Sequence, residues 1–340
     1  MSRFPFGTPL GWYPVAWSFE VEAGQVARRQ YFGRDLVVFR GESGEASVLD
    51  AYCPHLGAHL GVGGKVEGDT IRCPFHGWKF GAGGECVEIP YAKRVPPSAK
   101  AKAYSSAEIG GMIWAWYHPQ DDAPSFDPPE IPEFGEPGWM PQWKHYEWKI
   151  RTHPQEVAEN SVDWPHLHEV HLMDPPDEAT VRFEGHEILW TAATTKRVST
   201  LEDASDEIKI IGRNAGLGSS YVKYTGMGDS VIVMGMTPID DEMMHMRFGV
   251  IGKQPDDDRG IAEWSQFFHA YADDMAAATE QDFPIWENKV YRDRPRLCEG
   301  DGPVKDYRGW ASQFYVDEGA EKGAEKGAGA RAGTGADGAG

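Results

Sequence analysis

The sequence has few cysteines and no long apolar run. Its 340 residues include only four cysteines, too few for the disulfide framework that holds small secreted proteins together. The longest apolar stretches, such as residues 112–117 and 231–236, fall far short of the ~20 residues that a membrane helix needs. The first ten residues lack the apolar core of a secretion signal. We therefore expect a cytoplasmic protein without a membrane span.

Positive charge and a dinucleotide-binding motif are also missing. The chain has 33 Lys and Arg against 53 Asp and Glu, a net charge of −20, which argues against a nucleic-acid partner. No Gly-x-Gly-x2-Gly follows a strand-like run, so neither a flavin nor a nicotinamide site is predicted. Aromatic residues are plentiful, with 13 Trp, 15 Phe and 13 Tyr, enough for a sizeable core.

Two short cysteine and histidine motifs are the most informative feature. Cys53-Pro-His55 is followed by Cys73-Pro-Phe-His76, and each motif comes after a strand-like run. Nearby glycines supply the backbone freedom that two ligand-bearing turns need. Two thiolates and two imidazoles at this spacing match the ligands of a Rieske [2Fe-2S] centre, in which two His replace two Cys on one iron.

A structural Cys2His2 zinc site uses the same four atoms and is the alternative. Zinc sites usually have Cys-x2-4-Cys and His-x3-5-His pairs, whereas here each loop mixes one Cys with one His. The mixed loops favour the redox cluster. Cys86 and Cys298 are outside the pattern and are interpreted as ordinary free thiols.

The chain divides into two domains with a proline-rich segment between them. Residues 1–122 are rich in glycine and short apolar segments, which predicts an antiparallel β domain with two cluster loops. Residues 123–141 are rich in proline and form the expected linker. Residues 142–317 contain the second domain, and residues 318–340, rich in Gly and Ala, are expected to be disordered. In the second domain we predict a helix around residues 155–171, strands at 187–191, 207–211, 230–236 and 243–251, and a long helix from about 261.

Two histidines in the second domain are candidate iron ligands. His166 and His171, with one carboxylate from elsewhere, would form the 2-His-1-carboxylate triad of a non-haem Fe(II) site. Histidines five apart do not share a face of a regular α-helix, so the site requires an irregular or terminating helix, which Pro165 favours. His168 is a competing ligand. A one-electron carrier in the same chain supports the iron site, because it needs an electron acceptor.

The third ligand is sought on the predicted long helix. An apolar stripe runs along it at spacings of four and three residues and includes one carboxylate, Asp282. A charge on a buried stripe is costly unless it is paired or bound to metal, so Asp282 is the chosen ligand and Asp274 its main rival. Pro284 should break the helix and expose the carboxylate to the metal. The stripe consists of Trp264, Phe268, Tyr271, Met275, Ala278, Asp282 and Ile285.

With these motifs the chain resembles the Rieske non-haem iron oxygenases over about residues 8–317. It is most similar to the oxygenase component of 3-ketosteroid 9α-hydroxylase and to cholesterol 7-desaturases. The resemblance implies an α+β fold, with an N-terminal antiparallel β Rieske domain and a C-terminal helix-grip, START-like catalytic domain. The matching motifs are Cys-Pro-His-Leu-Gly-Ala-His, Cys-Pro-Phe-His-Gly-Trp, Asn-x2-Asp-x2-His-x4-His, Ile89-Pro-Tyr91, Phe183-Glu-Gly-His186, Asp282-x2-Ile285-Trp286-x-Asn288-Lys289 and Trp310-x3-Phe314-Tyr315-Val316-Asp317.

The resemblance also implies roles for two further residues. Asp163 is similar to the family's bridging carboxylate, which links a cluster histidine of a neighbouring subunit to an iron-ligand histidine, so the working unit would be a homotrimer. The three-residue spacing from Asp163 to His166 independently allows a hydrogen bond that orients the imidazole. Asn160 is similar to the polar residue beside the iron, although it is equally compatible with a helix cap.

The predicted protein is thus the terminal oxygenase of a multicomponent system. It would use O2 and electrons from a separate NAD(P)H-dependent ferredoxin reductase or ferredoxin to hydroxylate a steroid or similar hydrophobic ring compound. Sterol 7-desaturation is the alternative within this class. Met173, Trp190, Met234 and Met236 are candidates for an apolar pocket, or plain core. Two hypotheses from other classes are a Rieske electron carrier without a catalytic iron and a zinc-stabilised interaction module.

Overall fold

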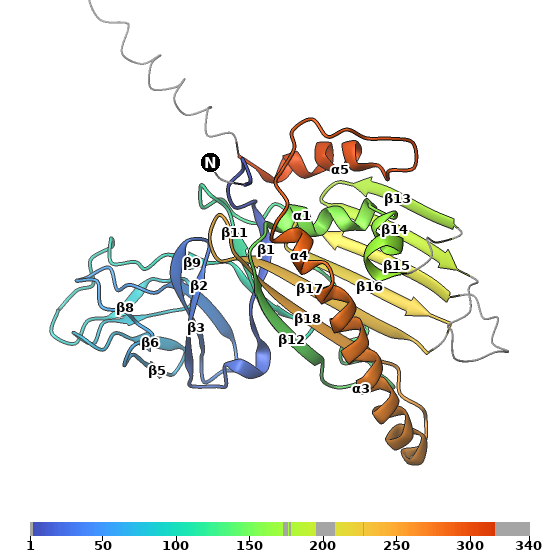
Figure 1. The fold of residues 1–340 in the computed structure, drawn as a ribbon. Coiled ribbons are helices and arrows are strands. Elements are labelled where there is room, and N and C mark those ends of the chain that lie inside the picture. The colour runs from blue at the N-terminus through green and yellow to red at the C-terminus, as the bar shows by residue number, and fades with distance from the viewer. Residues whose placement is uncertain (1–2, 173–175, 177, 195–207, 227, 317–340) are drawn as a thin grey trace, which may run out of the picture.

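The computed structural model describes residues 3–172, 176, 178–194, 208–226 and 228–316 (Figure 1). The predicted disordered tail at 318–340, Met173 and the start of the predicted strand at 207 lie outside these residues. Within the described ranges, no helix is both long and apolar enough to cross a membrane.

The first part of the chain is built from short strands. They are β1 (Gly11–Trp17), β2 (Val26–Tyr31), β3 (Arg34–Arg40), β4 (Ala46–Asp50), β5 (Lys65–Glu67), β6 (Thr70–Arg72), β7 (Lys79–Phe80), β8 (Cys86–Glu88), β9 (Ala103–Tyr104), β10 (Ser106–Ile109) and β11 (Met112–Tyr117), with the 3-10 helix η1 (Ser18–Glu20) after β1.

The second part combines long strands with helices. The strands are β12 (Lys144–Ile150), β13 (Glu178–Glu184), β14 (Glu187–Thr194), β15 (Ile208–Ala215), β16 (Ser219–Thr225), β17 (Ser230–Pro238) and β18 (Met244–Gly252). The helices are α1 (Pro154–Ala158), η2 (Glu159–Val162), α2 (His166–His171), α3 (Asp258–Glu280), α4 (Phe283–Trp286), α5 (Val304–Ala311) and η3 (Ser312–Phe314).

Three small antiparallel sheets make up the first part. Their strand orders are β2-β3-β4-β9, β5-β6-β7-β8 and β1-β11-β10. The central strands β3, β4 and β11 are short apolar runs. Alternate residues of β3 and β4 pack into two cores on opposite sides of their sheet, and those of β11 pack into one of these cores and into a third. The prediction of an antiparallel β domain is confirmed. Residues 123–141 carry turns and one isolated bridge, from Trp139 to Lys253.

A seven-stranded antiparallel sheet forms the platform of the second part. Its order is β12-β18-β17-β16-β15-β14-β13, and the long helix α3 runs across it (Figure 1). Side chains alternate between the two faces of a strand, so the even-numbered residues of β14 to β17 share the face toward α3. On that face Phe248, Val250 and Ile232 pack against Phe268 and Ala272 of α3. The predicted α+β fold, with a large sheet gripping a long helix, is confirmed.

Two predicted helices differ from the structure. The helix expected around residues 155–171 is broken into α1, η2 and α2, because Pro165 interrupts it after an irregular residue, Asp163. The long helix ends at Glu280, and a separate short helix, α4, begins at Phe283 with Pro284 in its first turn. Asp282 therefore does not lie on the long helix, and Ile285, the last residue of the predicted stripe, is 48% exposed.

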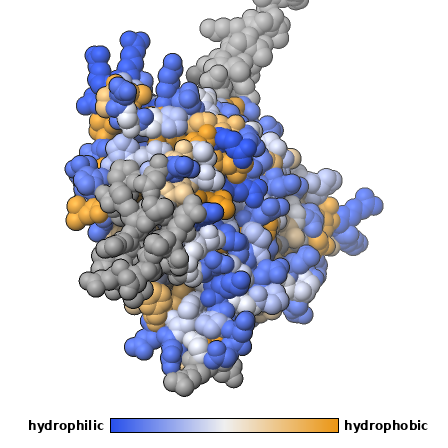
Figure 2. Space-filling model, turned by 90° about the vertical axis from the view of Figure 1, so that its right-hand side faces the viewer, coloured by the Kyte–Doolittle hydropathy of each residue, from blue (hydrophilic) through white to orange (hydrophobic). Residues whose placement is uncertain are grey.

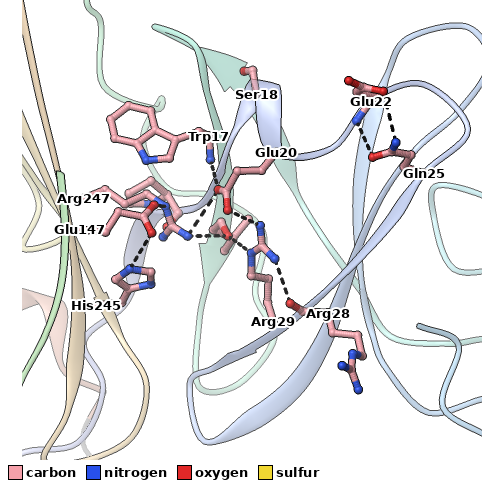
Figure 3. A network of polar contacts seen from close by, with 12 residues as sticks. Trp17, Ser18, Glu20, Glu22, Gln25, Arg28, Arg29, Glu147, His245 and Arg247 are labelled. Carbon is pink, nitrogen blue, oxygen red and sulfur yellow. Dashed lines mark hydrogen bonds and ion pairs between the residues drawn. The ribbon is translucent and has the colours of Figure 1, made fainter. Parts of the chain in front are cut away.

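A buried arginine joins the two parts of the molecule (Figure 3). Arg247 of β18 is 1% exposed and donates hydrogen bonds to the backbone carbonyls of Pro14, at 2.9 Å, and Val15, at 3.2 Å. Its guanidinium also lies 3.2 Å from the carboxylate of Glu147, the residue opposite it on β12. Burial by itself raises the pKa of Glu147, but the hydrogen bond from His245 and the charge of Arg247 outweigh it and hold this pKa at about 2.

We expect Arg247→Met to lower the free energy of unfolding by about 3 kcal/mol, because it removes the positive charge that faces the Glu147 carboxylate and takes one of the donors from each of two buried carbonyls. Denaturant titration followed by circular dichroism measures the change. Arg28→Met is the matched control on β2, where the side chain is exposed, and should change the value by less than about 0.5 kcal/mol. Equal losses in the two variants would contradict this role of Arg247.

Candidate iron centres

The two cysteine and histidine loops adopt the same turn. The backbone N–H of Gly57 donates to the carbonyl of Cys53 at 2.9 Å, and the N–H of Gly77 donates to that of Cys73 at 3.1 Å. Both glycines have positive φ values, 74° and 73°, which side chains with a Cβ rarely adopt. Each turn thereby starts at a Cys and contains one His, two residues after Cys53 in the first loop and three residues after Cys73 in the second.

The four predicted ligands of the cluster lie together. Cys53 and Cys73 are 2% and 3% exposed, and the rings of His55 and His76 are 4.7 Å apart between centroids. The Nδ1 atom of His76 is buried and has no hydrogen-bond partner among the described residues. Burial raises the pKa of the Cys53 thiol to about 11, so a thiolate there needs a bound cation. These groups fit a [2Fe-2S] cluster, which supplies such cations and a ligand position for the histidine.

Aromatic residues surround the cluster loops, and sequence reasoning placed them in motifs without giving them a role. The indole of Trp78 stacks on His55 at 4.4 Å, and its Nε1 donates to the hydroxyl of Tyr91 at 2.8 Å. Leu56, Phe75 and Tyr91 are 65%, 62% and 62% exposed. We call these three residues the apolar rim. Their presence in the motifs was visible in the sequence, but their exposure follows from the turns.

The second candidate site joins two distant parts of the chain. His166 and His171 on α2 each present one ligand atom, and the carboxylate of Asp282 supplies a third, with all three atoms within 4.8 Å of one another. The two imidazole rings are 5.4 Å apart and nearly perpendicular, at 77°. Two imidazoles and one carboxylate form the facial set that holds a non-haem Fe(II) and leaves positions open.

Both imidazoles are oriented by a hydrogen bond at Nδ1, which leaves Nε2 for a metal. The Nδ1 of His166 contacts the backbone carbonyl of Asp163. The Nδ1 of His171 lies 2.9 Å from the Oε1 of Gln281. Such bonds set the tautomer and the ring orientation of a ligating histidine. Gln281 was not predicted, and the only available signal was its position next to Asp282.

Asp282 supplies a buried carboxylate at the junction of α3 and α4. It is 7% exposed, and its Oδ2 lies 3.4 Å from the Nε2 of His171. Burial raises its pKa, whereas the two histidines act to lower it. A cation between them would relieve the cost of the buried charge. Asp274, the rival ligand, is exposed on α3, and His168 is exposed on α2.

Asp163 and Asn160 lie beside the histidines, each in a specific position. The side-chain Oδ2 of Asp163 is 3.9 Å from the Nδ1 of His166, so the backbone of Asp163, not its carboxylate, makes the orienting bond. The carboxylate side chain is 43% exposed. The amide Nδ2 of Asn160 lies 3.5 Å from the Nε2 of His166 and points at the ligand set.

Buried ion pairs hold the helices around this site. Lys289, after α4, reaches the fully buried Glu156 of α1 at 2.8 Å. Arg308 of α5 reaches Glu159 of η2, which directly continues α1, also at 2.8 Å. The segment after α4 and helix α5 are thus tied to α1 and η2, which lead into the histidine helix α2.

A cavity of 780 Å³ opens beside the three ligands. The even-numbered face of β14 to β18 lines one side and α3 lines the other, with α2, η2 and α4 at the metal end. Most of its side chains are apolar, including Trp190, Met234 and Met236, which were named as pocket candidates. The outer face over β13 to β16 and α3 is mostly hydrophilic, with apolar residues in small groups (Figure 2).

Comparisons with known proteins agree with this geometry. Residues 115–315 match the 3-ketosteroid 9alpha-hydroxylase C-terminal domain family, and residues 11–100 match the Rieske [2Fe-2S] domain. A probable 3-ketosteroid-9-alpha-monooxygenase oxygenase component of Rhodococcus rhodochrous is 36% identical over 92% of this chain and 82% of its own. Cholesterol 7-desaturase of Xenopus laevis is 32% identical over 90% of this chain and 72% of its own.

Solved structures share the fold. Dicamba monooxygenase bound to dicamba superposes with a TM-score of 0.70 at 19% identity, covering 89% of this chain and 96% of the other. The NdmA QL mutant of Pseudomonas putida CBB5 with theobromine also gives 0.70, at 18% identity, over 88% of this chain and 89% of the other.

The two ligand sets on this fold define a Rieske non-haem iron oxygenase, an oxidoreductase that combines a [2Fe-2S] cluster with a mononuclear iron. Within that class, the chain belongs to the family of the 3-ketosteroid 9α-hydroxylase oxygenase components and the related cholesterol 7-desaturases.

We expect the purified protein to contain about three iron and about two acid-labile sulfide per chain. His171→Ala should lower the iron content to about two and leave the Rieske signal in electron paramagnetic resonance unchanged, because only the mononuclear site loses a ligand. His168→Ala, an exposed histidine on the same helix, is the control and should keep all the iron. Two irons per chain in both wild type and His171→Ala, after anaerobic Fe(II) reconstitution, would instead support an electron carrier.

Proposed function

We propose that this protein is the terminal oxygenase that hydroxylates a ketosteroid or a closely similar ring compound. The observation that carries the proposal is the 780 Å³ cavity, which is predominantly apolar and ends at His166, His171 and Asp282. A rigid, water-insoluble ring system fits such a space better than a flexible polar substrate does. The Rhodococcus rhodochrous relative whose name specifies 3-ketosteroid is also 36% identical to this chain.

The iron supplies O2 activation when it is bound and reduced. The chain's own residues provide the surroundings of that chemistry. Apolar side chains from the sheet and α3 bind the substrate and exclude water. Gln281 and the carbonyl of Asp163 keep the imidazoles oriented, and Asn160 offers a hydrogen-bond donor beside the ligands.

Electrons would come from a separate NAD(P)H-dependent reductase or ferredoxin and enter at the Rieske cluster. We propose that the apolar rim and the cluster of one subunit lie against a neighbour in a head-to-tail homotrimer. The partly exposed carboxylate of Asp163, 3.9 Å from His166, is available to bridge the two centres.

Sterol 7-desaturation is the second candidate. It rests on the 32% identity to the cholesterol 7-desaturase of Xenopus laevis. Both reactions begin with removal of a hydrogen atom from the substrate. They differ in the next step, which is transfer of a hydroxyl group to the substrate in hydroxylation and loss of a second hydrogen atom in desaturation.

Turnover with a ferredoxin reductase, NADH, isotopically labelled O2 and either a 3-ketosteroid or cholesterol separates these candidates. We expect a ketosteroid product that is heavier by one labelled oxygen atom in mass spectrometry. An unlabelled cholesterol product with two fewer hydrogen atoms would establish desaturation instead. Consumption of neither compound, by protein with full iron content, would refute a steroid substrate.

Asp163→Asn should slow reoxidation of the reduced cluster in single turnover by about tenfold or more, because the bridging charge next to an iron ligand is lost. Stopped-flow absorbance of the cluster measures this rate, and iron analysis confirms that both centres are filled. Glu169→Gln removes an exposed carboxylate from the following helix, α2, and should leave the rate unchanged. The same rate in Asp163→Asn and wild type would exclude the bridge.

A further inference from the structure

Two buried donors in the cavity wall have no acceptor among the residues that the structure describes. Asn214 of β15 is 0% exposed and lines the cavity, and its side-chain nitrogen Nδ2 has no hydrogen-bond partner in those ranges. The indole nitrogen Nε1 of Trp190, on the adjacent strand β14, is also buried and unpaired there. An unpaired buried donor costs about 1–3 kcal/mol, so such a group calls for an explanation.

The orientation of the Asn214 amide is determined by its neighbours. The hydroxyl of Ser161 donates to Oδ1 at 3.1 Å, and the hydroxyl of Ser220, directly opposite on β16, donates to Oδ1 at 3.5 Å. With the oxygen satisfied twice, the amide can only offer its N–H groups to a ligand. The indole of Trp190 has a single N–H and can only donate, so it also requires an acceptor on the ligand. This requirement stays even if the oxygen and nitrogen of the Asn214 amide exchange places.

The two donors come from neighbouring positions of adjacent strands in the wall. Trp190 is opposite Gly212 in the sheet, and its indole lies over that glycine. A Cβ added to Gly212 would be only 2.1 Å from the indole Nε1. Gly212 and Asn214 are two residues apart on one strand and share a face, so their Cα atoms are ~7 Å apart. The absence of a side chain at Gly212 therefore lets the indole edge lie over β15, two residues along the strand from Asn214.

This wall is close to the metal end of the cavity. Ser161, which bonds Asn214, is adjacent to Asn160, and Asn160 contacts the iron-ligand His166 at 3.5 Å. The polar pair at the other end differs, because the hydroxyls of Ser230 and Tyr271 lie 3.0 Å apart and satisfy each other. Asn214 and Trp190, the pair near the metal end, therefore offer buried donors that have no hydrogen-bond partner in the described ranges.

We propose that Asn214 and Trp190 together bind a carbonyl oxygen of the substrate and set which carbon faces the iron. A ketone oxygen has two lone pairs and accepts from both donors, whereas a hydroxyl also needs an acceptor for its own proton. The site thus selects ketosteroids over sterols. This inference rests on the proposed function and adds to it the group that is recognised and the residues that recognise it.

The test measures binding by equilibrium dialysis with the holoenzyme and no reductase, so that no turnover occurs. The probes are steroids that share the same ring nucleus. They differ only at one end of that nucleus, first one end and then the other, where they carry a ketone, an alcohol or no oxygen. Wild type should bind the steroid with a ketone at the recognised end about tenfold more tightly than it binds the steroid without oxygen there. In Trp190→Phe and in Asn214→Leu this ratio should fall toward one, while affinity for the compound without oxygen is kept.

Trp164→Phe is the matched control. Trp164 lines the same cavity with its ring 5.6 Å from that of Trp190, and the substitution removes the same kind of N–H group. It should leave the ketone ratio at its wild-type value. Retention of the Rieske spectrum and of affinity for the compound without oxygen shows that each variant is folded.

Unchanged ketone ratios in both Trp190→Phe and Asn214→Leu, with steroid binding intact, would overturn the donor pair and leave the proposed function standing. Equal binding of ketone and oxygen-free steroids by wild type would overturn it as well. If wild type binds no steroid at all, the proposed substrate class fails, and the donor pair as a ketosteroid site fails with it.

Discussion

The buried carboxylate of Asp282 is the constraint on which much of the second domain depends. A carboxylate that is 7% exposed, beside two imidazoles, is stable as an anion only if a positive charge compensates it. Its position requires that α3 end at Glu280 and that the chain turn before α4. The ion pairs of Lys289 and Arg308 then hold the surrounding helices. A charge that is costly by itself becomes a ligand because the surrounding segments fix it opposite the histidines.

The large sheet serves both as support and as the wall of the cavity. Side chains alternate along its strands, so the even-numbered ones point toward α3. Near the metal end this face carries apolar residues together with the polar Asn214 and Ser220. At its other end the face is closed by packing between β18 and α3. The same periodicity that builds a stable sheet therefore also determines which side chains can meet a substrate.

The first domain is fastened to this sheet through β1 and the turn after β2. Arg247 donates to two backbone carbonyls of β1, and the N–H of Phe32 donates to the carbonyl of Pro238 at 2.9 Å. The cluster loops are at the far side of that domain, where the apolar rim is exposed. This arrangement separates the cluster loops from the cavity within one chain, as the proposed transfer to a neighbouring subunit requires.

The sequence by itself determined the chemistry of the two centres. Only a few residue types can bind iron, and most of the ligands here are close together in the sequence. Cys53, His55, Cys73 and His76 sit on tight loops, so their identity and spacing carried most of the information. Asp282 was chosen from an apolar periodicity, although the helix assumed for it ends two residues earlier. Only the tertiary structure placed Asp282 against residues more than a hundred positions away, showed that Gln281 orients His171, and paired Trp190 with Gly212 next to Asn214. Those relations depend on strand register and helix ends, which long-range packing decides and local patterns do not encode.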